Sequence, residues 1–249
     1  MIEQRMRLND PEAYRRGDEL SLLTELVAVE GRRVLELGCG AAFMTRVIAQ
    51  RLGAAEVMAT EVDRIQHERN LAAAASEGLD RIQFRYGGAE SIAAPDASFD
   101  LVFMLKSLHH VPVDRMDQAL SEIHRVLVPD GLLYVSEPVY WGEFNALMCL
   151  IEDEQAVRRA AFEALCRAVD AGRFELVEEV FIESEGVYAD WETFAARFIQ
   201  VTHREQVLDA ARLARIRAAF ERHLTDAGAR FWKPHRIDVL RRRAPNPHA

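Results

Sequence analysis

An acidic side chain and two glycines stand at the end of an apolar run in VLELGCG, residues 34–40. Because glycine has no Cβ, Gly38 and Gly40 let the chain turn tightly and let a ligand lie against the backbone. A carboxylate that closes an apolar strand, as Glu36 does, is costly to bury unless a positive or hydrogen-bonding group meets it. The amino group of a ligand would meet it, directly or through water. The alternative is a plain strand-to-helix turn.

A second carboxylate, Glu61, ends the strand expected over residues 56–61. An acid at this point of a βαβ unit can accept hydrogen bonds from both hydroxyls of a ribose, although an ordinary surface carboxylate is the alternative. Asp63, two residues on, is better suited to cap the helix that follows. The dinucleotide fingerprint GxGxxG would need glycine at position 43, where the chain has Phe43, and this disfavours a nicotinamide cofactor.

Two adjacent histidines, His109 and His110, follow the apolar run 99–105. An unperturbed imidazole titrates near pH ~6.5, so either could act as a general base towards a hydroxyl or a protonated amine. The alternative is that one caps the turn after the strand and the other packs beneath it. The pair is not a metal signal by itself, because no third ligand is recognisable nearby, and we expect no metal.

Other charged and aromatic residues could contact an acceptor molecule, each with a plainer alternative. Lys106 could attract an acidic acceptor or extend into solvent, and Glu137, at the end of the run 132–137, is expected to point towards a cleft. Three aromatic residues could wall an acceptor pocket or seat the next helix: Tyr140, Trp141 and Phe144. Four basic residues on later helices could meet a carboxylate or remain solvated: Arg158, Arg159, His203 and Arg204.

Strands and helices alternate from residue 31 onward. We expect strands over residues 33–37, 56–61, 81–86, 99–105 and 132–137, and helices over 41–52, 64–77 and 114–127. Asp63 would cap the helix over 64–77 and Gly78 would end it. This order predicts an α/β fold, a Rossmann-like, doubly wound, mostly parallel seven-stranded sheet with an added helical cover.

The flanking segments complete this arrangement. Residues 10–29 have a helical period, and helices are expected over about 144–171, 190–202 and 205–225. Two strand-like segments, 174–183 and 235–241, would form the far edge of the same sheet. We therefore expect a single domain over 1–249, with an N-terminal helical segment (1–30), a ligand-binding core (31–138) and a helical cover with edge strands (139–249).

Composition narrows the class of protein. The net charge of −9 disfavours a nucleic-acid partner, because such proteins usually carry a basic face. Three cysteines without CxxC spacing fit free thiols in a reducing cytoplasm. No window approaches the ~20 apolar residues of a membrane span, and the N-terminus lacks an apolar stretch of signal-peptide length. We expect a cytoplasmic protein without membrane partners, and a homodimer remains open.

Five segments in order resemble the motifs of class I S-adenosylmethionine-dependent methyltransferases: VLELGCGAAF, ATEVD, GGAE, SFDLVFMLKSLHHV and LVPDGLLYVSEP. The resemblance runs from about residue 32 to 138. It implies S-adenosylmethionine as cofactor, S-adenosylhomocysteine as product, and methyl transfer to a small-molecule acceptor. Such a transfer is an in-line displacement in which positioning alone can contribute ~7–11 kcal/mol. The alternatives are a catalytically silent protein that binds the cofactor and, less favoured, a nicotinamide-dependent oxidoreductase.

The resemblance also implies roles for matching positions. Glu36, Gly38 and Gly40 would hold the methionine portion of the cofactor, Glu61 would hold the ribose, and Val62 would pack on the adenine. The further cofactor contacts that it implies are Ala89 and Glu90 at the adenine edge, Met104, Leu105 and Lys106 beside the sulfonium, and Tyr14 folded over the cofactor.

The sequence departs from the family pattern at two positions. Ala42 replaces the third glycine of the first motif, which is a small change. The segment usually written GDAE has glycine at Gly88, so the aspartate that commonly takes the adenine amino group is absent. Either Glu90 or a backbone carbonyl would take that amino group, or the affinity is lower.

Overall fold

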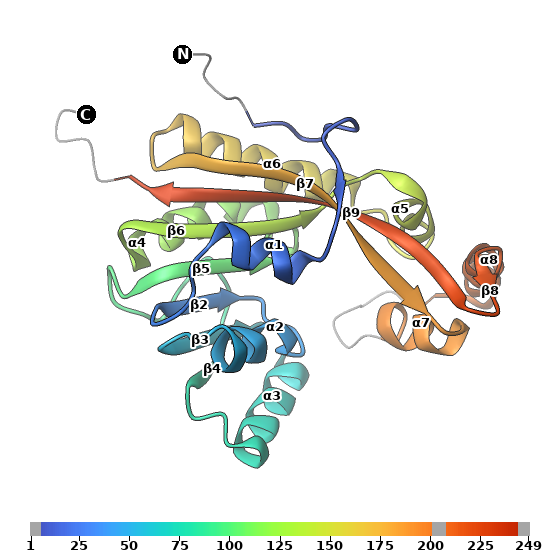
Figure 1. Ribbon diagram of the computed structural model, residues 1–249, viewed down its shortest axis with the longest axis horizontal. Coiled ribbons are helices and arrows are strands. Elements are labelled where there is room, and N and C mark those ends of the chain that lie inside the picture. Colours follow the sequence, from blue (N-terminus) through green and yellow to red (C-terminus); the bar gives the residue numbers. More distant parts are fainter. Residues whose placement is uncertain (1–5, 201–207, 244–249) are drawn as a thin grey trace.

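The expected alternation of strands and helices is present in the computed structural model of the chain, which describes residues 6–200 and 208–243 (Figure 1). The elements from residue 31 to 138 are β2 (Arg33–Leu37), α2 (Phe43–Arg46), β3 (Glu56–Glu61), α3 (Arg64–Glu77), β4 (Ile82–Tyr86), β5 (Phe99–Leu105), α4 (Met116–Val126) and β6 (Leu127–Pro138). A π-helical stretch, Val47–Arg51, continues α2. Two short 3₁₀ turns, Leu108–His110 and Val113–Arg115, lead into α4.

Helix α3 begins and ends at the predicted residues. The Asp63 carboxylate accepts hydrogen bonds from the backbone N–H groups of Ile65 and Gln66, which otherwise have no partner in the first turn. Gly78 ends the helix with φ of 65°, a conformation that favours glycine. These local signals are independent of tertiary packing, which is why the sequence predicts them well.

The described part of the second half of the chain supplies the rest of the sheet, four helices and one short strand, β8. Its elements are α5 (Gly142–Cys149), α6 (Gln155–Asp170), β7 (Phe174–Tyr188), α7 (Trp191–Phe198), α8 (Ala210–Glu221), β8 (Leu224–Thr225) and β9 (Gly228–Arg242). The expected ends of two helices, over 201–202 and 205–207, lie outside the described residues, as do His203 and Arg204.

The prediction of one helix over 144–171 is wrong, because the chain breaks between α5 and α6. The backbone N–H of Glu152 bonds to the carbonyl of Met148, and the Asp153 carboxylate accepts from Gln155 N–H at 3.1 Å. An acidic run at this point favours a new helix start, since acids interact well with free N–H groups. The apolar period alone does not reveal the break.

The prediction of a helix over 10–29 is also wrong in extent. Only α1 (Glu19–Leu26) is helical, with Asp18 as its N-cap accepting from Ser21 N–H. Before it, β1 (Arg15–Arg16) pairs with β7 in parallel. The N-terminal segment therefore lies along the edge strand β7 in an extended conformation before α1 begins.

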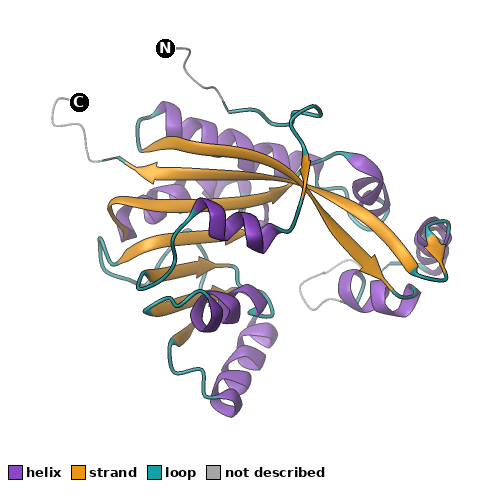
Figure 2. Ribbon diagram, viewed as in Figure 1, coloured by secondary structure: helices purple, strands orange, loops and turns teal. Residues whose placement is uncertain are grey.

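The sheet has nine strands, and the seven that were expected lie in the order β4-β3-β2-β5-β6-β9-β7. Strands β2 to β6 are mutually parallel, whereas β9 is antiparallel to both β6 and β7. Figure 2 shows helices on both faces. One apolar cluster joins the sheet to α4 and α6, and another joins it to α1, the α2 region and α3. The fold is thus the predicted Rossmann-like, doubly wound α/β arrangement, with two additional two-residue strands.

Strands β7 and β9 pair along their whole length, from Phe174↔Arg242 to Tyr188↔Ala229. Beyond the end of β6, the two strands continue alone as a two-stranded ribbon. Figure 1 shows α7 and α8 at the far end of this ribbon, away from β2, β3 and β4. A third apolar cluster holds this end together, with residues from α5, α7, α8 and the ribbon. The expected helical cover is therefore gathered mainly on the ribbon. None of the helices in the described residues is both long and apolar enough to cross a membrane.

Candidate functional site

The turn after β2 lies at the carboxyl edge of the parallel strands, where ligands of doubly wound sheets bind. The N–H groups of Gly38 and Cys39 both donate to the Thr60 carbonyl, at 3.0 and 2.9 Å, so the turn is held against the end of β3. Gly38 has φ of +72°, and a Cβ there would lie 2.7 Å from the Cβ of Ser107 in the loop after β5. Ser107 in turn donates its hydroxyl to the Leu37 carbonyl at 2.7 Å. Only glycine lets these two loops approach so closely.

The Glu61 carboxylate is fixed beside the glycines. One oxygen accepts from Gly40 N–H at 2.8 Å, and the other accepts from Val62 and Asp63 N–H groups at 2.8 and 2.9 Å. Each carboxylate oxygen has about two acceptor sites, so the oxygen facing Gly40 keeps one for a further donor. The structure therefore brings together the two strand ends that were singled out in the sequence.

Glu36 lies on the neighbouring strand and is only 2% exposed. Its carboxylate accepts from the Thr45 hydroxyl at 2.6 Å. Burial raises the pKa of Glu36 to about 7, with the Thr45 hydrogen bond opposing the rise and the charge of Glu61 adding to it. A cation placed next to this carboxylate would restore its ionised form, which is the behaviour expected of a group that binds an ammonium.

The residues expected at the adenine lie at the ends of β3 and β4. The Val62 side chain is 58% exposed, although it is apolar, and Ala89 is buried. A Cβ added at Gly88 would overlap the carboxylate oxygens of Glu90. The Glu90 carboxylate thus occupies the space next to the position where the family motif has its aspartate, and its role at the adenine stays a prediction.

Lys106, just after β5, was expected to attract an acidic acceptor or to extend into solvent, and the structure shows a different arrangement. Met104 is buried in the core and Leu105 is half-buried. The Lys106 ammonium pairs with the Glu19 carboxylate of α1 at 2.5 Å, and Glu19 also accepts from the Ser136 hydroxyl. The charge of Lys106 is therefore matched within the protein, by a residue that no sequence signal had marked.

His109 and His110 differ in environment. His109 is buried, and its Nδ1 hydrogen-bonds to Glu137, whose other oxygen accepts from Leu108 N–H at 2.9 Å. Burial would lower the pKa of His109, but the carboxylates of Glu137 and Glu154 together raise it above the usual value. The expectation that Glu137 ends its strand near a cleft holds, and it has the additional role of orienting His109. His110 is exposed.

A third potential metal ligand lies beside the histidines. One ligand atom each from His109, His110 and Glu154 lie within 4.8 Å of one another, and His109 Nε2 is 4.0 Å from Glu154. Glu154 could not be recognised as a neighbour of the histidines from the sequence, because it comes from the start of α6, far along the chain. Arg158 already pairs with Glu154 at 2.6 Å and supplies a positive charge there. We therefore do not assign a metal to this group.

Tyr14 lies near the end of β6. Its hydroxyl donates to Asn9 at 2.9 Å, and its ring lies 4.7 Å from Trp141 and 5.4 Å from Phe181, measured between centroids. Of the three aromatic residues expected to wall an acceptor pocket or seat the next helix, Tyr140 lines a cavity, whereas Phe144 packs on Tyr188 and Phe231 in the ribbon cluster. The role of Tyr14 over a cofactor stays a prediction.

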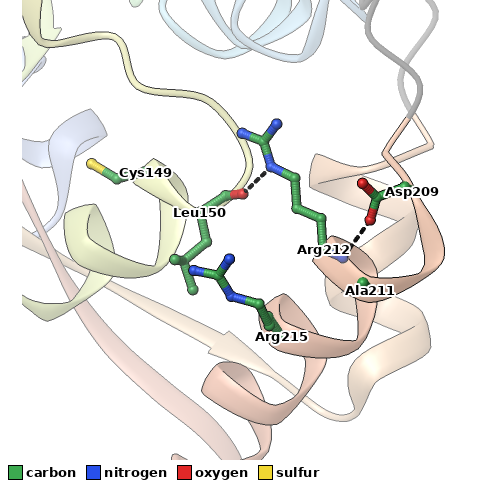
Figure 3. A pocket seen from close by; sticks show the side chains of 6 residues that line it. All are labelled: Cys149, Leu150, Asp209, Ala211, Arg212 and Arg215. Atoms are coloured by element: carbon green, nitrogen blue, oxygen red, sulfur yellow. Dashed lines mark hydrogen bonds between the residues drawn. The ribbon is translucent and has the colours of Figure 1, made fainter.

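Two cavities in the described part of the chain could hold a small molecule. One, of about 210 Å³, is bounded by the N-terminal segment, the end of β6, the start of α6 and β9. Glu137, Tyr140, Arg158 and Arg159 are among its lining residues. The other, of about 410 Å³, lies between α5 and α8 (Figure 3).

The amino-acid sequence is also similar to those of known methyltransferases. The family described as "Methyltransferase domain" matches residues 34–131. A probable chloroplastic tocopherol O-methyltransferase of Oryza sativa subsp. japonica is 32% identical over 141 residues, which cover 56% of this chain and 36% of that protein. This chain thus spans little more than a third of the length of that curated relative.

Solved structures show the same fold. The YcgJ protein of Bacillus subtilis aligns with a TM-score of 0.62 and 19% identity, over 90% of this chain and 98% of that one. The [4+2]-cyclase SpnF aligns with a TM-score of 0.58 and 23% identity, over 90% of this chain and 80% of that one. Residues 34–131 are thus similar to a methyltransferase domain, and the chain has the Rossmann-like fold of solved structures that include methyltransferases.

Proposed function

We propose that this protein transfers the methyl group of S-adenosylmethionine to a nucleophilic atom of a small molecule. The observation that carries the proposal is a pair of buried carboxylates, Glu36 and Glu61, at the ends of adjacent parallel strands on either side of a glycine turn. A ligand with both an ammonium and a ribose matches that pair, since Glu36 has no ion pair within residues 6–200 and 208–243 and Glu61 keeps an acceptor site beside Gly40.

The residues of the site fit each part of this cofactor. Glu36 would accept from its ammonium and Glu61 from a ribose hydroxyl. The exposed Val62 side chain would pack on the adenine, and Glu90, next to Gly88, would accept from the adenine amino group. When bound, the cofactor supplies a methyl group already activated by a positive sulfur. The chain itself then has to hold the acceptor in line and exclude water.

A proton acceptor is needed where the acceptor atom is a hydroxyl or a protonated amine. We propose His109 for this role, with Glu137 holding its ring through Nδ1 and leaving Nε2 as the atom that moves the proton. His110, exposed beside it, is the alternative from the same pair. Acceptors of small size fit the name of the rice relative, a probable tocopherol O-methyltransferase.

A protein that binds the cofactor without transferring its methyl group is the second candidate. Fold does not determine reaction, and one structural neighbour with this fold is named as a [4+2]-cyclase. Glycine at position 88 favours this candidate to the extent that it weakens the adenine contacts. A nicotinamide-dependent oxidoreductase is less favoured, because Phe43, which is 71% exposed, stands where the dinucleotide fingerprint has glycine. A cytoplasmic location and a homodimer stay predictions.

Calorimetric titration with S-adenosylhomocysteine tests the cofactor site. Glu36→Gln keeps an acceptor for Thr45 but removes the negative charge, so we expect binding at least about tenfold weaker than in the unmodified protein. Glu56→Gln, at the exposed opposite end of β3, is the matched control and is expected to bind as the unmodified protein does. No binding by the unmodified protein at millimolar ligand, or equal binding by Glu36→Gln, would contradict the proposal.

Methyl transfer is tested separately. The protein is incubated with S-adenosylmethionine labelled in its methyl group and with a metabolite extract, and products are searched for the label by mass spectrometry. A labelled product supports the methyltransferase. Tight cofactor binding with no labelled product across several extracts would favour the silent binding protein.

A further inference from the structure

The 210 Å³ cavity at the carboxyl end of β6 is lined by several arginines, although the chain as a whole is acidic. Its charged lining residues are three arginines, Arg158, Arg159 and Arg236, and one carboxylate, Glu137. The whole chain carries −9. Arg158 and Arg236 are paired with Glu154 and Asp238, so the charge left for a ligand is mainly that of Arg159, at a cavity that also touches the His109–Glu137 pair proposed to handle the proton.

Two of these arginines are held in place by partners of their own. Arg236 is 3% exposed, donates through Nε to Asp238 at 2.8 Å, and lies over the ring of Phe162 at 4.5 Å from its centroid. Arg158 donates to Glu154 and, at 2.8 Å, to the side-chain oxygen of Asn145. Guanidinium groups fixed in this way lose little further side-chain entropy when a ligand binds.

Arg159, the third, is exposed on α6 and makes no ion pair among the described residues. Arg159 therefore lines the cavity together with two arginines whose side chains are already fixed. Planar guanidinium groups bind carboxylates through two parallel hydrogen bonds, which gives orientation as well as affinity. The remaining wall includes Leu8, Pro138 and Val139, which suit a hydrocarbon body.

From these observations we propose that the cavity binds the carboxylate of an acceptor that also has an apolar body. The inference names the chemical class of the acceptor, and in that respect it rests on the proposed function. An anion would be repelled by most of a chain with this net charge, so a local positive cavity also gives selectivity for where the acceptor binds.

The larger cavity does not have these properties. Figure 3 shows Arg212 and Arg215 of α8 facing it across from Leu150. The Arg212 side chain donates to the carbonyl oxygens of Leu150 and Ile151 at 2.9 and 3.1 Å, and Asp209 lines the same cavity. The Arg212 charge thus stabilises the end of α5, where free carbonyls gather, and we assign no ligand there.

The test uses hexanoate as a probe and hexanamide as its uncharged analogue, titrated into the full chain and followed by NMR in a buffer of low chloride. We expect saturable binding of hexanoate and none of hexanamide. Arg159→Gln should weaken hexanoate binding at least about tenfold, since it removes one charged bidentate contact. Arg167→Gln, on the same helix but paired with Asp117, is the matched control and should bind hexanoate normally.

Absence of saturable hexanoate binding, or equal binding by Arg159→Gln and Arg167→Gln, would overturn the inference. Equal binding of the amide would do the same. S-adenosylhomocysteine is titrated into the same samples to separate the two proposals. Cofactor binding without hexanoate binding removes only the carboxylate inference, whereas hexanoate binding without cofactor binding removes only the proposed function.

Discussion

The Glu36 carboxyl shows at the scale of one residue how burial prepares a group for a ligand. Its pKa is raised from 4.5 to about 7, first by burial, with Glu61 adding to the rise and the Thr45 hydroxyl opposing it. The free protein is therefore expected to hold a mixture of charged and neutral Glu36 near neutral pH. An ammonium at this place would convert the group to its charged form and release a proton on binding.

This shift predicts a dependence of stability on pH. The folded state binds the Glu36 proton more tightly than the unfolded state, so its contribution is complete below pH 4.5 and is lost as pH rises towards about 7. The loss is about 3 kcal/mol of unfolding free energy for a shift of this size. Glu36→Gln should lack that fall, measured by urea unfolding at about pH 5 and about pH 8, with Glu56→Gln as control. The same pH dependence in both variants would show that Glu36 is not the group responsible.

Glu137 is predicted to determine the pKa of His109. Burial lowers that pKa, and the carboxylates of Glu137 and Glu154 more than compensate. Glu137→Gln keeps a polar group of similar shape and removes one of the charges, so the pKa of His109 should fall below its value in the unmodified protein. Histidine resonances followed by NMR against pH measure it, and Glu143→Gln, on the exposed start of α5, is the control. An unchanged pKa in Glu137→Gln would exclude the orienting role proposed for this carboxylate.

At the scale of elements, the strand-to-helix turns carry most of what the sequence predicted correctly. Strands 33–37, 56–61 and 99–105 begin and end at the predicted residues. The almost wholly apolar run 99–105 marks a strand that is buried on both faces. The helix over 64–77 is also correct, since a cap and a terminal glycine act locally. The break between α5 and α6 lies at the acidic run that starts α6, and the apolar period alone does not mark it.

Gly38 and Gly31 form a matched pair that tests the packing of the turn after β2. Both have positive φ, +72° and +70°, so alanine at either costs about 1–2 kcal/mol in backbone conformation. Only at Gly38 would the new Cβ meet Ser107, at 2.7 Å, whereas nothing lies within 4 Å at Gly31. We expect Gly38→Ala to cost on the order of 1–3 kcal/mol more in thermal unfolding.

The same pair separates stability from binding. Because the contact with Ser107 joins the loops after β2 and β5, Gly38→Ala should also weaken binding of S-adenosylhomocysteine, and Gly31→Ala should not. Equal losses of stability and of affinity in the two variants would mean that the close approach of these loops has no role in the site.

The whole molecule divides its apolar packing into the two faces of the sheet and the end of the β7–β9 ribbon. Phe220 is fully buried in the ribbon cluster, with its ring 4.8 Å from Phe194 and 5.9 Å from Trp191 between centroids. This end shares few elements with the glycine turn. Local opening there would therefore leave β2 and β5 intact.

Phe220→Ala should cost about 3–5 kcal/mol within the ribbon cluster, because it leaves a large cavity. Hydrogen exchange is expected to accelerate in α7, α8 and the outer ribbon and to stay unchanged in β2 and β5. Phe43→Ala, which removes the same side chain from an exposed position, should leave both regions unchanged. Faster exchange in β2 in the Phe220 variant would show instead that the ribbon and the sheet unfold as one unit.

The sequence by itself determined the order of the elements and the pair of acids beside the glycines, because apolar runs, caps and turns act between residues close in the chain. It did not determine the partners of the charged groups. Lys106 pairs with Glu19, 87 positions away, and Arg236 of β9 joins two arginines of α6 at one cavity. Such partners depend on which strands become neighbours in the sheet, and long-range packing alone decides that.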